Sequence, residues 1–190
     1  MKSLLVPLLG LALLSGCSSS LPLNLHLSPK VAEQTVKYPA NTTTALVSSD
    51  LRTQPHIVSI QEDDKPTTLV NNDVPVRILL ADKLGQGLTE QGVTITGSSS
   101  TKLHLDVVAM ETKIIKNGTS FDAQSTTQLT LVIEKPTRKI TKQYKTVSTK
   151  TGPFSPTAAE LEEGLNKQLT TLLADILNDK QLFEELNKKD

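Results

Sequence analysis

Two long runs of alternating apolar and polar residues, separated by a turn sequence, constrain the fold more than any other feature of this chain. Residues 102–109 and 121–133 alternate with the period of two that is typical of a strand with one buried face. Between them stands Asn117-Gly118, a pair favoured in type I′ hairpin turns, whose two central residues need positive φ. The predicted inward residues are Leu103, Leu105, Val107, Ala109, Phe121, Ala123, Ser125, Thr127, Leu129, Leu131 and Ile133. We therefore expect an antiparallel hairpin at the centre of the domain.

Further strand patterns lie on both sides of this hairpin. Residues 135–137, with the sequence Lys-Pro-Thr, predict a second turn, and the pattern at 140–144 predicts a third antiparallel strand. Upstream, residues 43–52 alternate, and residues 56–61 are predicted to form a short partner strand. A first strand is expected at residues 23–28, where leucine alternates with other residues. These patterns predict an antiparallel sheet with a solvated outer face.

One helix is predicted between the early strands and the hairpin. Asp73 can cap its N-terminus, and Pro75 fits the first turn because the missing N–H has no partner there. Apolar residues follow with helical spacing, and Gly92 is a natural stop. Gly85 and Gly87 weaken the end of this helix by up to about 1 kcal/mol each relative to alanine. They could also let a neighbouring strand approach closely.

A second, longer helix is predicted near the C-terminus. Thr157 and Glu160 form a capping-box sequence, and an apolar stripe then runs to Ile176. Asn178-Asp179 interrupts the stripe, and a short helix is expected at 180–187. The predicted fold class is α+β: an antiparallel β-sheet of about four to six strands, with two main helices packed on one face and a short C-terminal helix.

The N-terminus has the pattern of an export signal. Lys2 precedes an apolar run at residues 4–14, which is too short to span a bilayer, since a spanning helix needs about 20 residues. Ser15 and Gly16 are small residues that fit a signal peptidase, and Cys17 follows them. The L-S-G-C ending resembles the lipobox of bacterial lipoproteins. That resemblance implies that the thiol receives a diacylglycerol and that the chain is cut before it and acylated at the new N-terminus.

Cys17 is the only cysteine, so in an exported chain it has no disulfide partner, and a thioether to lipid protects it from oxidation. Each buried methylene of an acyl chain contributes about 0.8 kcal/mol, and stable anchoring takes two or more signals. The alternative is an ordinary cleaved signal with a stray or buried cysteine. The predicted division is a signal peptide at 1–16, a lipidated tether at 17–22 and one α+β domain at 23–190.

Composition excludes some partners. Without residues 1–16 the chain has a net charge of about −1, which lacks the basic surplus of nucleic-acid-binding proteins. The chain has no tryptophan, so aromatic platforms for sugar stacking are not expected. Ser18 follows the cysteine where, by resemblance to the enterobacterial sorting rule, an aspartate would indicate the inner membrane. We therefore expect the periplasmic face of the outer membrane.

No combination of residues predicts catalysis. His26, His56 and His104 are isolated in sequence, and none has zinc-ligand spacing, although the three could converge in space. We interpret them as solvated or structural histidines. No G-x-S-x-G or S-x-x-K sequence is present. We therefore predict no catalytic residue, no cofactor and no metal site.

One basic cluster is a hypothetical binding site. Its members are Lys135, Arg138, Lys139, Lys142, Lys145 and Lys150. In an extended strand Lys139 and Lys145 share one face, whereas Lys142 lies on the other. One interpretation is that Lys139, Lys142 and Lys145 bind acidic peptidoglycan, anionic lipid or an acidic envelope protein. The alternative is an edge strand that lysines protect against aggregation.

Several segments together resemble one family. The lipobox, S-D-L-R-T at 49–53, V-R-I-L-L at 76–80 and L-L-A-D-I-L-N-D at 172–179 followed by F-E-E-L are similar to the YajG-like lipoproteins of Gram-negative bacteria. The resemblance implies an uncharacterised envelope lipoprotein and carries over only Cys17 as a functional position.

Three hypotheses follow for the function. The first is a non-enzymatic interaction or structural module of the cell envelope, anchored in the outer membrane and engaging a protein or peptidoglycan partner. The alternative is a carrier of a small apolar ligand or lipid between helices and sheet, with Gly85 and Gly87 making room for it. The third is a hydrolase without recognisable motifs.

Overall fold

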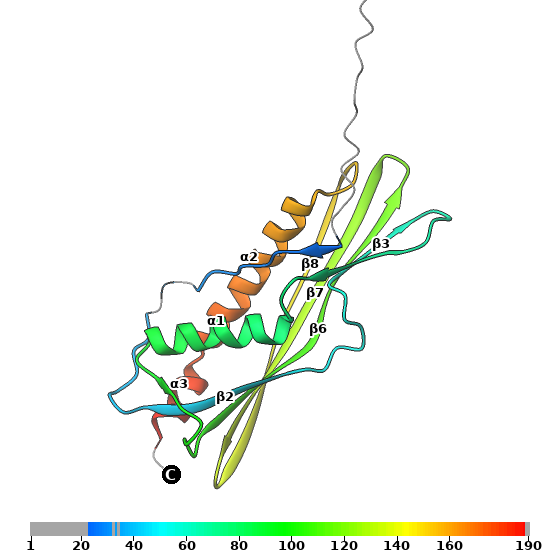
Figure 1. The fold of residues 1–190 in the computed structure, drawn as a ribbon. Helices are drawn as coiled ribbons and strands as arrows, with labels where there is room; N and C mark the ends of the chain where they lie inside the picture. The colour runs from blue at the N-terminus through cyan, green and yellow to red at the C-terminus, as the bar shows by residue number, and fades with distance from the viewer. Residues whose placement is uncertain (1–22, 32, 34, 189–190) are drawn as a thin grey trace, which may run out of the picture.

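The structure is a computed structural model that describes residues 23–31, 33 and 35–188. Eight strands form one curled, mixed sheet, and three helices lie against one face of it (Figure 1). The elements, in chain order, are β1 (Asn24–Leu25), β2 (Thr43–Asp50), β3 (Val58–Glu62), β4 (Thr68–Asn72), α1 (Val76–Glu90), β5 (Thr94–Ile95), β6 (Lys102–Asn117), β7 (Ser120–Lys135), β8 (Arg138–Pro153), α2 (Ala158–Leu177) and α3 (Lys180–Asn187).

A meander of three 16-residue strands, β6, β7 and β8, forms the main part of the sheet. The two predicted hairpins are confirmed, because Asn117 pairs with Ser120 and Lys135 pairs with Arg138 across two-residue turns. The type of the first turn differs from the prediction. Its central residues are Gly118 and Thr119, and of these two only Gly118 has positive φ, at 61°. Glycine at the first central position is the pattern of a type II′ turn.

A β-bulge in β6 changes which residues face the core. The register with β7 shifts between Val107 and Ala109. Before the bulge the odd-numbered residues point inward, and after it Met110, Thr112 and Ile114 do so. The inward position predicted for Ala109 is therefore wrong, because the extra residue of a bulge reverses the alternation along the strand.

The second edge of β6 pairs with two strands that follow one another along it. β2 pairs in parallel with residues 102–107, and β3 pairs in parallel with residues 112–116. The predicted pairing of residues 43–52 with 56–61 is therefore wrong: β2 and β3 are consecutive pieces that run in the same direction. Arg52 stabilises the loop between them through two hydrogen bonds to the Asp50 carboxylate, at 2.9 and 2.8 Å.

The predicted fold class is accordingly wrong. The sheet is mixed rather than antiparallel, since β6 has parallel neighbours on one edge and an antiparallel neighbour on the other. It curls into a half-barrel with eight strands, more than predicted. None of the helices in the described part of the chain is long and apolar enough to cross a membrane.

The helices begin and end close to the predicted residues, but one cap differs. The capping box of α2 is present, with Thr157 and Glu160 each accepting a backbone N–H of the other. The predicted cap of α1 is absent: Pro75 is its N-cap residue, and no side chain bonds to the free N–H groups there. Asp73 instead bonds the ring of His26, with 2.5 Å between Oδ2 and Nδ1.

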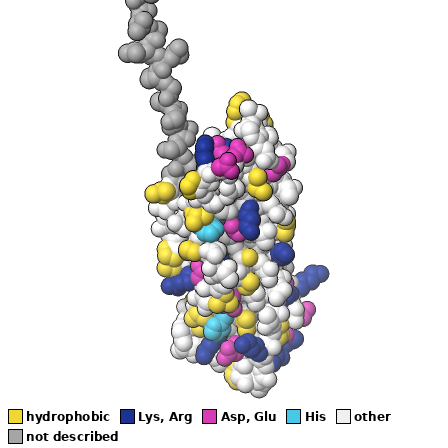
Figure 2. Space-filling model, turned by 90° about the vertical axis from the view of Figure 1, so that its right-hand side faces the viewer, with side chains coloured by type: hydrophobic (Ala, Val, Ile, Leu, Met, Phe, Trp, Pro, Cys, Tyr) yellow, Lys and Arg dark blue, Asp and Glu magenta, His cyan; other side chains and the backbone are white. Residues whose placement is uncertain are grey.

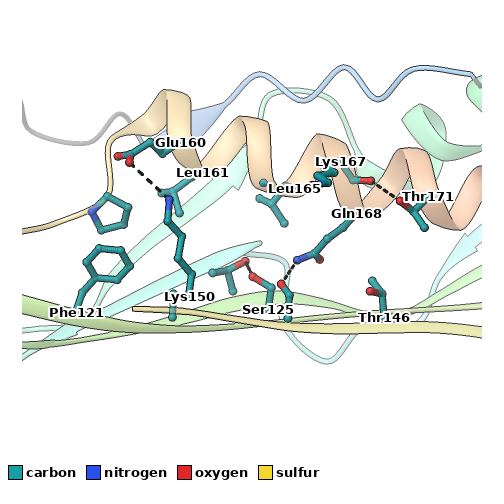
Figure 3. Close-up of a pocket in the computed structure, with 15 residues that line it drawn as sticks. Phe121, Ser125, Thr146, Lys150, Glu160, Leu161, Leu165, Lys167, Gln168 and Thr171 are labelled. Carbon is teal, nitrogen blue, oxygen red and sulfur yellow. Dashed lines mark hydrogen bonds and ion pairs between the residues drawn. The ribbon is translucent and has the colours of Figure 1, made fainter. Parts of the chain in front are cut away.

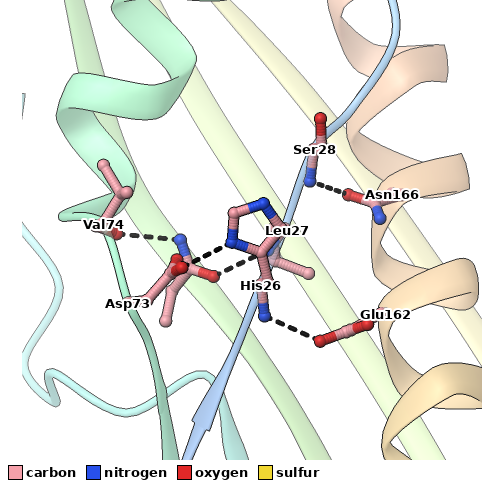
Figure 4. A network of polar contacts seen from close by, with 8 residues as sticks. His26, Leu27, Ser28, Asp73, Val74, Glu162 and Asn166 are labelled. Carbon is pink, nitrogen blue, oxygen red and sulfur yellow. Dashed lines mark hydrogen bonds and ion pairs between the residues drawn. The ribbon is translucent and has the colours of Figure 1, made fainter.

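Residues 26–30 form an extended segment, here called the strap, which crosses from β4 to α2 (Figure 4). Three of its backbone N–H groups bond side chains of α2: His26 to Glu162 at 2.7 Å, Ser28 to Asn166 at 2.7 Å, and Lys30 to Thr170 at 3.0 Å. Two residues of extended chain rise about 6.6 Å, and four residues of helix rise about 6 Å. Because these distances nearly match, every second N–H of the strap meets every fourth side chain of α2.

Candidate functional site: a cleft between α2 and the sheet

The inward face of the meander changes from large to small side chains along its length. Near the turn between β7 and β8, the inward residues Leu129, Leu131 and Ile133 are fully or almost fully buried and fill the space under the helices. Toward the other end, small and hydroxyl side chains such as Ala123 and Ser125 take their place. A leucine stripe still holds α2 over the sheet, so the small side chains leave a cleft beneath the first half of the helix.

The cleft has a volume of about 340 Å³. Side chains from the sheet and from α2 face one another across it (Figure 3). Its lining combines apolar groups with hydroxyl and amide groups: Thr112, Phe121, Ala123, Ser125, Thr146, Ser148, Lys150, Pro156, Glu160, Leu161, Gly164, Leu165, Lys167, Gln168 and Thr171. This volume is at the lower end of the range for small-molecule sites.

The polar groups of the cleft bond mainly to one another. Gln168 donates from Nε2 to Ser148 Oγ at 2.5 Å, which joins α2 to β8. The hydroxyls of Thr112 and Ser125 are 2.7 Å apart. No histidine or cysteine is among the lining residues. The hydrogen bonds of the lining hydroxyls go to hydroxyl, amide and backbone groups, and Lys150 and Glu160 pair with each other.

Glu160 is held as a carboxylate at the mouth of the cleft. Hydrogen bonds from the backbone N–H and then the hydroxyl of Thr157 lower the pKa of Glu160 below its usual value. Lys150 adds a weaker ion pair at 3.6 Å. A carboxyl group with a lowered pKa stays charged at neutral pH, so Glu160 and Lys150 place one negative and one positive group beside the cleft.

The same cleft lies along the edge of the sheet. Within the described residues, β8 pairs only with β7. Lys135 and Arg138 close a two-residue hairpin, so the even-numbered residues of β8 bond to β7. The odd-numbered residues, from 139 to 151, direct their N–H and C=O groups to the open edge. The side chains of the even-numbered residues 146–150 line the cleft.

The structure separates the three lysines that were predicted to bind a partner. Lys139 and Lys145 are exposed on the outer face and have no ion pair with another described residue. Lys142 lies on the inner face and donates to Asp179, which also accepts from the Tyr144 hydroxyl at 3.0 Å. Burial alone would raise the pKa of Asp179, but these hydrogen bonds and that from the Leu182 N–H lower it. Lys142 therefore joins β8 to the start of α3.

The histidines do not converge. Each lies beside a different carboxylate: His26 beside Asp73, His56 beside Glu111 and His104 beside Glu134. In the part of the chain that the structure describes, no three metal-ligating side chains form a group. Cys17, the predicted lipidation site, lies outside the described residues.

Gly85 and Gly87 do not make room for a ligand. A Cβ atom on Gly87 would lie 2.3 Å from Leu177 Cδ1, and one on Gly85 would lie 3.2 Å from Ile95 Cδ1. The two glycines let α1 pack closely on α2 and β5, so that part of the proposed cavity is filled. The sequence signal for the real cleft was the change from leucine to alanine, serine and threonine along residues 121–133, which the prediction treated only as an inward face.

Residues 29–187 match a family model that is described as an uncharacterized lipoprotein, Lipoprotein_16. The chain belongs to this lipoprotein family. The lipoprotein is 22% identical over 185 residues to the uncharacterized lipoprotein YajG of Escherichia coli strain K12, which covers 96% of this chain and 95% of YajG. The resemblance predicted from the sequence is confirmed.

The fold of this lipoprotein is also found in solved structures. Protein XCC0632 from Xanthomonas campestris superposes with a TM-score of 0.56 at 14% identity, covering 85% of the lipoprotein and 94% of that chain. A second uncharacterized protein gives a TM-score of 0.50, also at 14% identity, over 80% of the lipoprotein and 99% of that chain. Likeness at this level of identity shows a common fold and no common activity.

Proposed function

We propose that this lipoprotein is a non-enzymatic binding module on the periplasmic face of the outer membrane, held there by acyl chains on Cys17. Its binding element is the edge of β8 together with the cleft beneath α2, and its partner is an extended segment of an envelope protein. Membership of a lipoprotein family supports the anchor. The observation that carries the binding role is the position of the cleft along an open strand edge.

A strand edge and a cleft beside it suit an extended peptide. The odd-numbered residues of β8 offer backbone N–H and C=O groups that an added strand can bond, which gives affinity without sequence preference. Alternate side chains of the added strand would point into the cleft, where Phe121 and Leu165 supply apolar contact and Gln168 supplies an amide. The cleft would therefore supply the selectivity of the interaction for small apolar or hydroxyl side chains.

The lysines beside the open edge of β8 narrow the range of suitable partner segments further. Lys139 and Lys145 flank the open edge on its outer face, about 20 Å apart by the rise of a strand. Opposite charges facing each other across two strands are stabilising, and like charges are not. A segment with acidic residues on its outer face fits this edge better than a second copy of the lysine-bearing β8.

Photocrosslinking in intact cells tests the proposal. A photoreactive amino acid at Gln143, on the open edge, is expected to trap a specific envelope protein, whereas the same group at Asp82, exposed on α1, is not. Thr149→Pro removes an outward N–H without touching the bonds to β7, and proline is tolerated at such edge positions. This change should abolish the crosslink, while Thr149→Ala should keep it. A crosslink that survives Thr149→Pro, or that forms equally from position 82, would show that the edge is not the binding element.

The anchor is tested separately. The intact mass of the membrane-extracted protein should show cleavage before Cys17 and the added acyl chains. Cys17→Ser should leave the chain with its signal peptide or release it from the outer membrane. An unmodified thiol in the mature protein would contradict the proposed anchor, and it would say nothing about the edge of β8.

The cleft also supports a second candidate function, the binding of a small apolar ligand or lipid. The observation that favours it is the apolar contact offered from both sides of a cleft of about 340 Å³, by Phe121 on the sheet and by Leu161 and Leu165 on α2. Native mass spectrometry of the protein purified from membranes is expected to show a bound amphiphile if the cleft is occupied in this way. Loss of that mass in Gly164→Leu, which fills the cleft from α2, would assign it to this site.

A further inference from the structure

The loop between β8 and α2 exposes an aromatic residue in an unfavourable backbone conformation. Phe154 has a φ of 61°, in the left-handed region that a bulky side chain rarely adopts. Its side chain is among the most exposed large apolar groups of the described residues, with 72% of its surface accessible. Strain at such a position persists only where the surrounding structure enforces it, and it is often associated with function.

The surrounding structure fixes this loop firmly. The N–H of Phe154 donates to the carbonyl of Thr119, in the turn between β6 and β7, at 2.7 Å. Two residues earlier, Gly152 lies against the ring of Phe121, where an added Cβ would come within 2.9 Å. The loop and the turn are therefore joined at one end of the molecule, here called the tip: residues 117–120 and 152–156. The tip holds the ring of Phe154 in solvent, although glycine or asparagine would suit the backbone better.

The tip itself has no charged residue, and an exposed apolar side chain and paired lysines lie next to it. Ile115, close to the turn in β6, is 52% exposed, and Figure 2 shows hydrophobic side chains at the upper end of the molecule. The cations near this end are engaged: Lys116 pairs with Glu62 at 2.7 Å, and Lys150 pairs with Glu160 at 3.6 Å. A surface of this kind favours an apolar partner over a charged one.

The tether is short enough that a membrane holding Cys17 lies within reach of the tip. Leu23, where the description of the chain begins, bonds to Asn71 of β4, and the register through β4 and β3 places this point level with Thr112 of β6. From Thr112 to the turn at Gly118, six residues of strand rise about 20 Å. The six residues from Cys17 to Leu23 reach at most about 20 Å as well. An anchored Cys17 therefore lies no farther from Leu23 than the tip does.

We propose that the tip docks on the lipid surface that holds the Cys17 acyl chains, with the ring of Phe154 inserted at the boundary between headgroups and acyl chains. This inference rests on the lipid anchor of the proposed function. An aromatic ring that is exposed at the end nearest the anchor has its apolar partner within reach, and the contact needs no basic residues. Docking would orient the long axis of the sheet away from the membrane and leave the edge of β8 open to the periplasm.

Because the chain has no tryptophan, a single substitution gives a specific reporter. Phe154→Trp places the only indole at the tip, and Thr137→Trp places it in the turn at the opposite end of the meander as the matched control. Both lipidated full-length variants are reconstituted in vesicles of phosphatidylethanolamine and phosphatidylglycerol with brominated acyl chains. The indole fluorescence of the tip variant should fall about twofold relative to unbrominated vesicles, while that of the control variant should not change, since bromine quenches only rings inserted to the acyl boundary. High salt should not reverse the quenching.

Equal fluorescence of the Phe154→Trp variant in brominated and unbrominated vesicles would overturn the proposal. That result is also the one expected if the ring binds a protein rather than lipid. Intact mass and vesicle flotation, measured on the same samples, separate this failure from failure of the anchor. Phe154→Gly serves as a second control, because it removes the aromatic ring and glycine adopts this φ without strain, so the variant is expected to fold. Vesicles should slow amide exchange at positions 152, 154 and 155 in the wild type and not in Phe154→Gly, since Pro153 and Pro156 have no N–H. Equal slowing in both proteins would also contradict docking through this ring.

Discussion

The close approach of α1 and α2 predicts that Gly87→Ala lowers the free energy of unfolding, whereas Gly164→Ala raises it. Gly87 is buried on α1, and a Cβ atom there would lie 2.3 and 2.9 Å from the two methyl carbons of Leu177. Leu177 has no accessible surface, so it cannot move aside. Overpacking of this kind costs about 1–3 kcal/mol, and the contact distance favours the upper end. The gain in helix propensity returns about 1 kcal/mol, so Gly87→Ala should destabilise the fold by about 2 kcal/mol.

Gly164 is the matched control, because it lies within α2 and an added Cβ would meet no atom within 4 Å. Gly164→Ala should therefore raise the free energy of unfolding by about 1 kcal/mol. Urea unfolding followed by far-UV circular dichroism measures both, and equal m-values would show that neither change alters the unfolded ensemble. For a chain of this size, each kcal/mol shifts the melting temperature by about 2–4 °C. If Gly87→Ala were as stable as Gly164→Ala, the argument that this glycine permits the helix contact would be refuted.

Two further predictions concern the charges. The pKa of His26 is raised, first by its hydrogen bond to Asp73, and the pKa of Asp73 is lowered by the same bond. The stabilisation from His26 is present below its usual pKa of 6.5 and lost as pH rises through the raised value, whereas that from Asp73 is lost as pH falls below 3.8. Amide protection of the strap should therefore be greatest between pH 3.8 and pH 6.5 and should decline in alkali. The alkaline decline should be absent in Asp73→Asn. Wild-type protection that stays unchanged up to about pH 9 would contradict a stabilising bond between His26 and Asp73. Lys142 faces Asp179. Lys142→Glu should therefore lower the free energy of unfolding by about 3 kcal/mol, because it leaves the partly buried carboxylate of Asp179 beside a like charge. Lys145→Glu, on the exposed face, should change the free energy of unfolding by less than about 0.5 kcal/mol. If urea unfolding gave equal effects for the two substitutions, the ion pair between Lys142 and Asp179 would contribute nothing to stability.

Features that depend on a few neighbouring residues could be predicted from the sequence. The capping box at Thr157, the two hairpin turns and the interruption at Asn178-Asp179 all depend on short-range hydrogen bonds or on glycine and proline geometry. The cap at Asp73 was predicted by the same reasoning and is wrong. Its carboxylate bonds His26, which is 47 residues away in the chain, and no local pattern shows that competitor.

The direction of β2 and β3 could not be predicted in this way. Alternation shows that a segment is extended, but it is the same for a parallel and an antiparallel strand. The loop at 51–57, held by Arg52 and Asp50, carries the chain past the bulge of β6 and back onto its edge in the same direction. The sequence analysis therefore predicts residues 56–61 as a partner strand of 43–52, and the bulge that the loop bypasses has no sequence signal of its own.

The cleft depends on the strap as much as on the small side chains beneath it. Asn166, which bonds the N–H of Ser28, stands between Leu165 and Lys167, and both of these line the cleft. Three hydrogen bonds from the strap, spaced along α2, hold the helix in place over the sheet. Because Gln168 is the next cleft residue along the helix and bonds Ser148 of β8, any shift of α2 changes the distance between the helix and the open edge. The spacing that lets every second strap residue meet every fourth helix residue therefore helps to set the width of the proposed binding site.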